Sequence, residues 1–312
     1  MKKIILRLSN EIGNQMFMYA SAYSISKKMN RNLFLDNETA FLSKKNVSKY
    51  GLYNFNITSP IIEDKLKFKN KYGYIKRKFL LKTEFLRPSK KFFIEKKDRH
   101  KITFFDEKFI NNRFNDVIYL EGHFESPKYF INDQNDIVNE FKFKDELKFK
   151  KIPFFNQINF ENSVGICIRQ NRFSEGRGQN TSINDEKSRK FTLEQIRYIN
   201  KSVSLIKTKI NNPIFYLWSN DLNSIPKDLL EFEFKKIDLT SQKIEFDQRI
   251  YSLFLLSQCK HFIVTTSTFN WWGAWLSNNK NKIIIRPDDD FFSNFRVNNR
   301  DFWPNEWIKL NF

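Results

Sequence analysis

Short apolar segments and helical patterns alternate through the second half of the chain, and this alternation constrains the fold more than any other feature. Each apolar segment has the length of a buried strand, and the segments between them place apolar residues at helical spacing. Strands that alternate with helices form a parallel sheet with helices on its faces. The predicted strands span residues 163–168, 213–218, 261–264 and 282–286, and the predicted helices span 193–209, 250–259 and 270–277.

The beginning of the chain repeats the pattern. A helix predicted at 15–29 separates two short apolar segments, and a further strand is predicted before the middle of the chain. We therefore expect an α/β fold of two doubly wound, Rossmann-like domains that face a cleft, with ligands at the carboxyl ends of the strands. The predicted strands of this first half span residues 4–8, 32–36 and 117–120.

A stretch of low complexity separates the two α/β patterns. Residues 141–162 are rich in Lys, Phe, Asn and Glu and include a single proline, Pro153. A composition shift of this kind is typical of a connection between domains. We place the boundary there and predict domains at 1–150 and 151–312.

Positive charge is unevenly distributed along the chain. The 312 residues carry a formal net charge of +19, and residues 65–101 alone hold 15 basic and 3 acidic residues with aromatic residues between them. Three interpretations stay open for this segment. It is a solvated helical face with its aromatic side chains in the core, a surface for anionic lipid or a polyanionic substrate, or a nucleic-acid contact. No known nucleic-acid-binding motif accompanies it.

Composition excludes several other classes of protein. Hydrophobic residues make up 40% of the chain, which excludes wholesale disorder, and 8 glycines with 8 prolines exclude a collagen-like chain. Two cysteines, Cys167 and Cys259, are too few for a disulfide scaffold, and the three histidines lack metal-ligand spacing. Arg7 interrupts the first apolar run, and no apolar stretch has the length of a membrane span. We expect a cytoplasmic protein, or one peripheral to the inner membrane.

Two strand ends carry candidate binding groups. Gly13 lies between the first strand and its helix, where free N–H groups can meet an anion, although an ordinary turn explains it equally. Arg169 leaves the carboxyl end of the 163–168 strand. A guanidinium there can bind a phosphate through two parallel hydrogen bonds, or it can simply be solvated at the strand end.

The third candidate is a run of hydroxyl and aromatic residues. Residues 265–268 read Thr-Thr-Ser-Thr and precede an aromatic helix with Trp271, Trp272 and Trp275. Hydroxyls and free N–H groups at a helix start can cap the helix or bind a diphosphate. The tryptophans fit a structural core, and Trp271 alternatively faces a sugar or base.

Together these sites suggest a diphosphate held by arginine and neutral donors. The chain has no P-loop lysine motif, no Gly-rich dinucleotide fingerprint and no Asp-x-Asp metal motif. Asp288–Asp290 follows Pro287 in a predicted surface turn and is expected to be structural.

The motifs resemble those of bacterial α-1,2-fucosyltransferases of glycosyltransferase family 11, in order and over nearly the whole chain. The most specific of them is the run from Ser267 to Trp275, which resembles the family's Ser-Thr-Phe-Ser-Trp-Trp-Gly-Ala-Trp. The other matching segments are 13–20, 122–130, 215–221, 259–261 and 303–308.

The chain departs from the family pattern at several positions. Where the family has His-x-Arg-Arg-x-Asp, this chain has residues 167–172, of which only the first arginine, Arg169, is kept. The histidine is Cys167 and the acid is Arg172. The remaining departures are Asn10-Glu11 for Gly-Gly, Thr266 for Asn, and a polar insert at 174–190.

The resemblance implies a GT-B type fold, a GDP-β-L-fucose donor and inversion by a single displacement, with no metal or other cofactor required. Arg169 would stabilise the departing diphosphate, together with Ser267, Thr268 and nearby N–H groups. The other implied donor contacts are Phe269, Trp271, Asn220, and Asp221 at guanine or ribose. The domain 151–312 would bind the donor, and the domain 1–150 would lie on the acceptor side.

The resemblance leaves the acceptor side less defined. Asn14 and Gln15 would face the cleft near the acceptor or the diphosphate. A general base must reach the acceptor hydroxyl, and Glu11 is the first candidate, with His123 and Glu125 as weaker ones. The implied acceptor is a galactose-containing glycan of lipopolysaccharide, capsule or a lipid-linked precursor.

Two alternatives belong to other classes of activity. One is a transferase with another nucleotide sugar on the same scaffold. The other is a non-enzymatic binder of polyanions or nucleic acid built on residues 65–101, whose binding would be salt-sensitive. The run from Ser267 to Trp275 favours the enzyme, and we expect no nucleic-acid partner.

Overall fold

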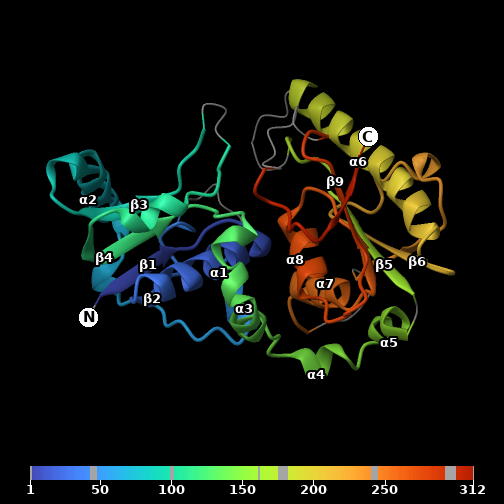
Figure 1. Cartoon of the computed structure of the whole chain (residues 1–312), viewed down its shortest axis with the longest axis horizontal. Helices are drawn as coiled ribbons and strands as arrows, with labels where there is room; N and C mark the ends of the chain where they lie inside the picture. The colour runs from blue at the N-terminus through green and yellow to red at the C-terminus, as the bar shows by residue number, and fades with distance from the viewer. Residues whose placement is uncertain are drawn as a thin grey trace. The chain divides into compact units, whose positions relative to one another are not determined.

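The chain divides into two units in the computed structural model, which describes residues 2–42, 48–98, 102–160, 162–174, 182–239, 245–291 and 300–311 (Figure 1). Unit 1 comprises Met1–Lys144 and Arg300–Trp303, and unit 2 comprises Asp145–Asn299 and Pro304–Phe312. Each unit contains its own sheet, so each is described by itself. The roles predicted for the two domains stay predictions.

Unit 1 has a parallel four-stranded sheet with the order β2-β1-β4-β3. The chain runs outward from β1 to β2 and then returns to the other side of β1, so the topological switch point lies between β1 and β4. Strands β1, β2, β3 and β4 span Lys3–Arg7, Asn32–Asp36, Lys90–Ile94 and Phe114–Glu121. Helices α1, α2 and α3 span Ile12–Lys28, Asn70–Lys82 and Gln134–Glu140, with 3-10 helices at Leu52–Asn54, Asp64–Leu66, Glu84–Leu86 (η3), Glu107–Asn111, Pro127–Tyr129 and Ile131–Asp133.

Unit 2 has a parallel six-stranded sheet with the order β10-β9-β8-β5-β6-β7. This is the strand order of the dinucleotide-binding fold, with its switch point between β5 and β8. Strands β5 to β10 span Ser163–Ile168, Ile214–Ser219, Lys235–Lys236, His261–Ile263, Ile284–Pro287 and Ile308–Leu310. Helices α4 to α8 span Glu146–Phe149, Pro153–Phe160, Ser182–Lys207, Gln248–Ser257 and Thr268–Leu276, with a 3-10 helix at Lys227–Leu229.

Alternate side chains of β5 pack on opposite faces of this sheet, as the pleat requires. Val164 and Ile166 belong to the core that includes residues of α6. On the other face Leu256 of α7 lies between Gly165 and Gly273 of α8, and a Cβ at Gly273 would come within 2.4 Å of its Cδ2 atom. The two glycines therefore let α7 and α8 approach the sheet and each other closely, which fixes the place of α8.

The structure confirms the predicted α/β class and the strands that were read from apolar segments, with ends that differ by a few residues. Helix α6 begins well before the predicted start, because residues 182–190 of the polar insert are helical; residues 175–181 lie outside the described part of the chain. Asp289 pairs with Arg286 at 2.7 Å and with Lys309 at 3.2 Å, which ties the turn of Asp288–Asp290 to β9 and β10.

Candidate functional site

The switch point of unit 2 brings together two of the sequence-predicted segments. Strands β5 and β8 are hydrogen-bonded neighbours, with Ile166 opposite Ile263. Arg169 follows β5 directly, and residues 265–267 connect β8 to α8. Ligands of open α/β sheets bind at such strand ends, where the connections diverge.

Arg169 is held by its backbone. The buried Gln195 of α6 accepts a hydrogen bond from Arg169 N at 3.1 Å and donates one to Arg169 O at 2.8 Å. The Arg169 side chain is partly exposed. Gln195 thus fixes the backbone position from which the Arg169 side chain extends. No sequence motif marks Gln195, because its partner lies 26 positions away.

The next residue, Gln170, ties β5 to β6. Its N–H donates to Asn220 Oδ1 at 2.8 Å, and its carbonyl accepts from Asn220 Nδ2 at 3.1 Å. The Gln170 side chain donates to the Asp221 carbonyl. The Asn220 amide therefore links two loops here, and its predicted contact with the donor stays a prediction.

Asp221 is partly exposed beyond the end of β6. Its carboxylate accepts hydrogen bonds from the Ser224 hydroxyl at 2.6 Å and from Ser224 N at 3.2 Å. These hydrogen bonds lower the pKa of Asp221, so the carboxylate is ionised at neutral pH. An ionised acceptor is what recognition of two N–H donors requires.

The start of α8 contains polar groups that the described protein atoms do not satisfy. Ser267 is the N-cap residue, and its side chain makes no capping hydrogen bond within the described structure. Among the described residues, Thr266 Oγ1 is buried without a hydrogen-bond partner, and the fully buried Asn270 side chain interacts with the Cys167 thiol. A buried polar atom without a hydrogen bond lowers the stability of the folded state by about 1–3 kcal/mol. Thr268 and Phe269, in the first turn, are partly exposed.

Arg172 supports the same connection from the other side. Its Nη1 atom donates to the Thr266 carbonyl at 2.8 Å, and its guanidinium lies 5.1 Å from the centre of the Phe191 ring. Arg172 stands where the family pattern has an acid, so in this chain that position carries a cation that positions the β8–α8 connection.

The tryptophans of α8 are structural. Trp271 has no exposed surface, and its ring contacts those of Trp272, Trp275 and Trp307 at centroid distances of 4.8, 6.0 and 5.4 Å. A side chain without accessible surface cannot meet a sugar or base. The predicted donor contact of Trp271 is therefore wrong.

The opposite end of α8 is capped by a lysine. Lys282 Nζ donates to the carbonyls of Ala274, Trp275 and Ser277 at 3.0, 3.2 and 2.8 Å. Burial lowers the pKa of Lys282 to about 8. The C-terminal carbonyls of α8 thus accept hydrogen bonds from Lys282, whereas its N-terminal end lies beside the ends of β5 and β8.

The switch point of unit 1 carries a different set of groups. Asn14, in the first turn of α1, donates to Glu125 Oε1 at 2.6 Å, and Asn10 Nδ2 lies 2.6 Å from His123 Nε2. His123 Nδ1 is 3.6 Å from Glu125 Oε1. The loops after β1 and β4 therefore join two amides, an imidazole and a carboxylate.

A buried carboxylate underlies this cluster. Glu95, beyond β3, accepts hydrogen bonds from His123 N at 2.8 Å and Phe124 N at 2.9 Å. Burial nevertheless raises the pKa of Glu95 to about 7. Gly122 has a φ of +154°, and a Cβ there would lie 2.3 Å from Glu95 Cβ. Glu95 was missed because β3 lies in the basic segment, where no strand was predicted.

The other two predicted residues of α1 differ in exposure. Gln15 is fully buried, and its amide binds the carbonyls of Asn10 and Lys49 and the N–H of Gly51. The prediction that Gln15 faces a ligand is wrong, because its donors and acceptor hold the surrounding loops. Glu11 is exposed at the N-cap of α1 and accepts from the Ser48 hydroxyl at 2.7 Å.

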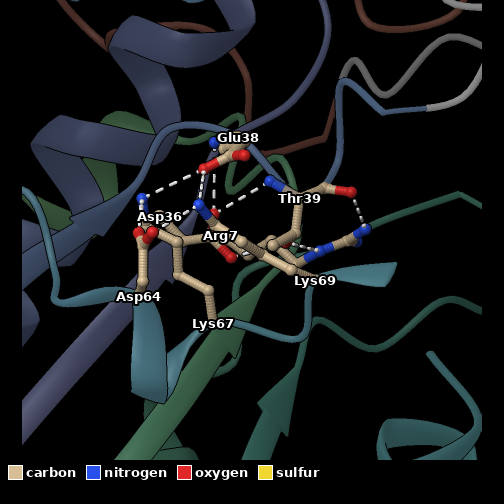
Figure 2. Close-up of polar contacts among 7 residues, drawn as sticks. All are labelled: Arg7, Asp36, Glu38, Thr39, Asp64, Lys67 and Lys69. Carbon is tan, nitrogen blue, oxygen red and sulfur yellow. Dashed lines mark hydrogen bonds and ion pairs between the residues drawn. The ribbon is translucent and has the colours of Figure 1, made fainter. Parts of the chain in front are cut away.

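Charged residues fill the neighbouring edge of unit 1 (Figure 2). Arg7 ends β1, and its guanidinium donates to Thr39 Oγ1 at 2.9 Å and to the Thr39 carbonyl at 3.1 Å. Asp36 accepts from Thr39 N at 2.9 Å. Lys67 and Lys69 share Glu38 with contacts of 3.2 and 2.7 Å. These groups hold the loop after β2, so we assign them a structural role.

The described residues contain no group of three or more His, Cys, Asp or Glu side chains with the arrangement of a metal site. None of the helices among them combines the length and the apolar character that crossing a bilayer requires.

The fold is that of GT-B type glycosyltransferases. Arabidopsis thaliana FUT1, solved as a mutant in complex with GDP, matches with a TM-score of 0.53 at 11% identity over 97% of this chain and 75% of that chain. The α-1,6-fucosyltransferase NodZ from Bradyrhizobium, co-crystallised with GDP, matches with a TM-score of 0.50 at 14% identity. The match covers 92% of this chain and 95% of that chain.

The chain belongs to glycosyl transferase family 11, whose model matches residues 2–311. An α-1,2-colitosyltransferase of Escherichia coli is 27% identical over 99% of both chains. The O-antigen biosynthesis glycosyltransferase WbnK of Escherichia coli is 24% identical over 97% of this chain and 99% of its own. A putative galactoside 2-α-L-fucosyltransferase of Caenorhabditis elegans, svh-11, is 26% identical over 98% of this chain and 78% of its own.

Proposed function

We propose that this family 11 glycosyltransferase moves L-fucose from GDP-β-L-fucose to the 2-hydroxyl of a galactoside in a surface glycan. The observation that carries the proposal is the start of α8, where Ser267, Thr268 and Phe269 are partly exposed beside the end of β5 and the Ser267 side chain makes no capping hydrogen bond within the described structure. The hydroxyls and N–H groups there are donors that a nucleoside diphosphate can use. Two fold neighbours were solved as complexes with GDP, and two of the relatives are named as an α-1,2-colitosyltransferase and a putative galactoside 2-α-L-fucosyltransferase.

In this proposal the donor diphosphate binds at the start of α8. The N–H groups of the first turn, with the hydroxyls of Ser267 and Thr268, would donate to phosphate oxygens. Arg169, fixed through Gln195, would carry the charge that develops on the leaving GDP. Asp221 would accept from guanine or ribose, with Asn220 and Phe269 beside it.

The reaction would be a single displacement. The acceptor oxygen attacks the anomeric carbon as the bond from that carbon to the phosphate oxygen breaks, and the leaving GDP takes the bonding electrons. The proton of the acceptor hydroxyl passes to a base. Glu11 is the first candidate, because it is an exposed carboxylate at the start of α1, and Glu125 beside His123 is the second.

A direct test incubates the purified enzyme with GDP-fucose and a panel of β-galactosides, and determines the linkage of the product by NMR. We expect α-1,2-linked fucose on at least one galactoside. Transfer to another hydroxyl, or hydrolysis of the donor without transfer, would contradict the proposal.

A second donor follows from one specific observation, the similarity to an α-1,2-colitosyltransferase over 99% of both chains. Colitose lacks one hydroxyl that fucose carries, so a site selective for colitose would exclude that hydroxyl. Equal concentrations of nucleotide-linked fucose and colitose, offered together, separate the two. Thermal shifts with GDP, UDP and CDP identify the nucleotide independently of the sugar.

A further inference from the structure

Helix α2 of unit 1 has two faces of different composition. Its inward face carries Leu80 and Leu81, which pack against the core cluster of Ile5, Ile62, Phe92 and Tyr119. On the same side Arg77 pairs with Glu121. These contacts anchor α2 to the sheet beside β3 and β4 (Figure 1). Gly73 is its only buried residue and lies against the backbone of Phe68.

The outward face of α2 is apolar although nothing in the described structure covers it. Tyr72, Ile75 and Phe79 are 74%, 64% and 63% exposed. Their spacing of three and four positions places them in one stripe along the helix, about opposite Leu80 and Leu81. The 3-10 helix η3, which follows α2 directly, exposes two further apolar side chains, Phe85 and Leu86, which are 82% and 70% exposed.

Lysines flank this stripe on both sides. By the helical repeat, Lys71, Lys78 and Lys82 lie along one edge of the stripe and Lys76 along the other. All four are exposed, and α2 contains no acidic residue. The nearby Glu84 points inward and accepts from the N–H groups of β3 residues 91 and 92.

We propose that the outward face of α2 and η3 docks on the surface of an anionic bilayer, with α2 lying in the interfacial plane. The apolar stripe would enter the boundary between headgroups and acyl chains, and the lysines would contact the anionic headgroups. A nucleic acid would match the charge but leave the aliphatic Ile75 and Leu86 exposed. A second copy of this chain would bring two sets of lysines together, which charge repulsion opposes.

The test is sedimentation of the purified chain with phosphatidylcholine vesicles, with and without phosphatidylglycerol. We expect binding to the anionic vesicles only. The stripe variant Tyr72→Ser/Ile75→Ser/Phe79→Ser should bind about tenfold more weakly or worse. The edge variant Lys71→Gln/Lys78→Gln/Lys82→Gln should lose the same amount together with the salt dependence.

A matched control replaces exposed aliphatic residues elsewhere, Leu147→Ser/Ile183→Ser, at positions 79% and 75% exposed. It should bind vesicles like the wild type, and all variants should keep transfer to a soluble acceptor. Failure of the wild type to bind, or a stripe variant that binds equally, overturns the docking surface. So does a dimer that the stripe variant dissociates, or binding of a DNA oligonucleotide in place of vesicles.

Discussion

The two switch points of this enzyme obey one topological rule and carry different chemistry. In unit 1 the strand ends bring together two carboxylates and an imidazole, those of Glu95, Glu125 and His123. In unit 2 they bring together Arg169 and the neutral donors Ser267 and Thr268. A carboxylate or imidazole can accept a proton, whereas an arginine with neutral donors can bind an anion at any physiological pH. The sheet order thus locates both sites, and the residue types separate their tasks.

The largest effect is expected at the anion site. Arg169→Ala should lower kcat by about 10²–10³, corresponding to about 2.7–4 kcal/mol of transition-state stabilisation, with an unchanged melting temperature. Arg197→Ala, at an exposed arginine of α6, is the matched control and should turn over normally. Normal turnover of Arg169→Ala would remove the distinction between the two clusters.

The next effect concerns the proton acceptor in unit 1. If Glu11 is the base, Glu11→Gln should lower kcat by about 10²-fold while Glu125→Gln retains most activity. The pH dependence of kcat should lose its acid limb in the variant that removes the base. If neither substitution changes the acid limb, neither Glu11 nor Glu125 is the base.

A smaller effect concerns stability. The pKa of Glu95 is raised from 4.5 to about 7 by burial, so the folded state holds this proton more tightly than the unfolded chain. The free energy of unfolding should therefore fall as pH rises from about 4.5 to about 7, by about 1–3 kcal/mol. Urea unfolding of wild type and Glu95→Gln across this range measures the difference. Parallel profiles would show that Glu95 has an ordinary pKa.

The smallest expected effect is that of chelation. Arginine and neutral donors replace a metal in our account of the anion site, so transfer should proceed at the same rate in EDTA. Activity that is lost on chelation and restored by magnesium or manganese would contradict it.

Strands and helices with an uninterrupted apolar pattern were predicted from the sequence, whereas elements whose apolar pattern is interrupted were missed. Strand β5 was predicted residue for residue, because six consecutive buried residues are apolar or small. Strand β3 was not predicted. It lies at the edge of the sheet, and the two lysines that begin it interrupt the apolar pattern of its buried residues Phe92 and Phe93.

Site residues show the same limit. Motifs at strand ends mark position, so the sequence placed Arg169 and Ser267 correctly after two neighbouring strands, whereas their roles stay predictions. Gln15 and Trp271 were misassigned, because a motif does not say whether a side chain faces a ligand or the core. Burial depends on packing against distant segments, as Trp307 beside Trp271 illustrates.

Calorimetric titration of GDP, in EDTA, into the wild type and two variants tests the division of tasks most directly. The account predicts that GDP binds the wild type, binds Arg169→Ala at least about tenfold more weakly, and binds Glu125→Gln with unchanged affinity. Equal affinity for Arg169→Ala and the wild type, or weakened binding by Glu125→Gln alone, would contradict it.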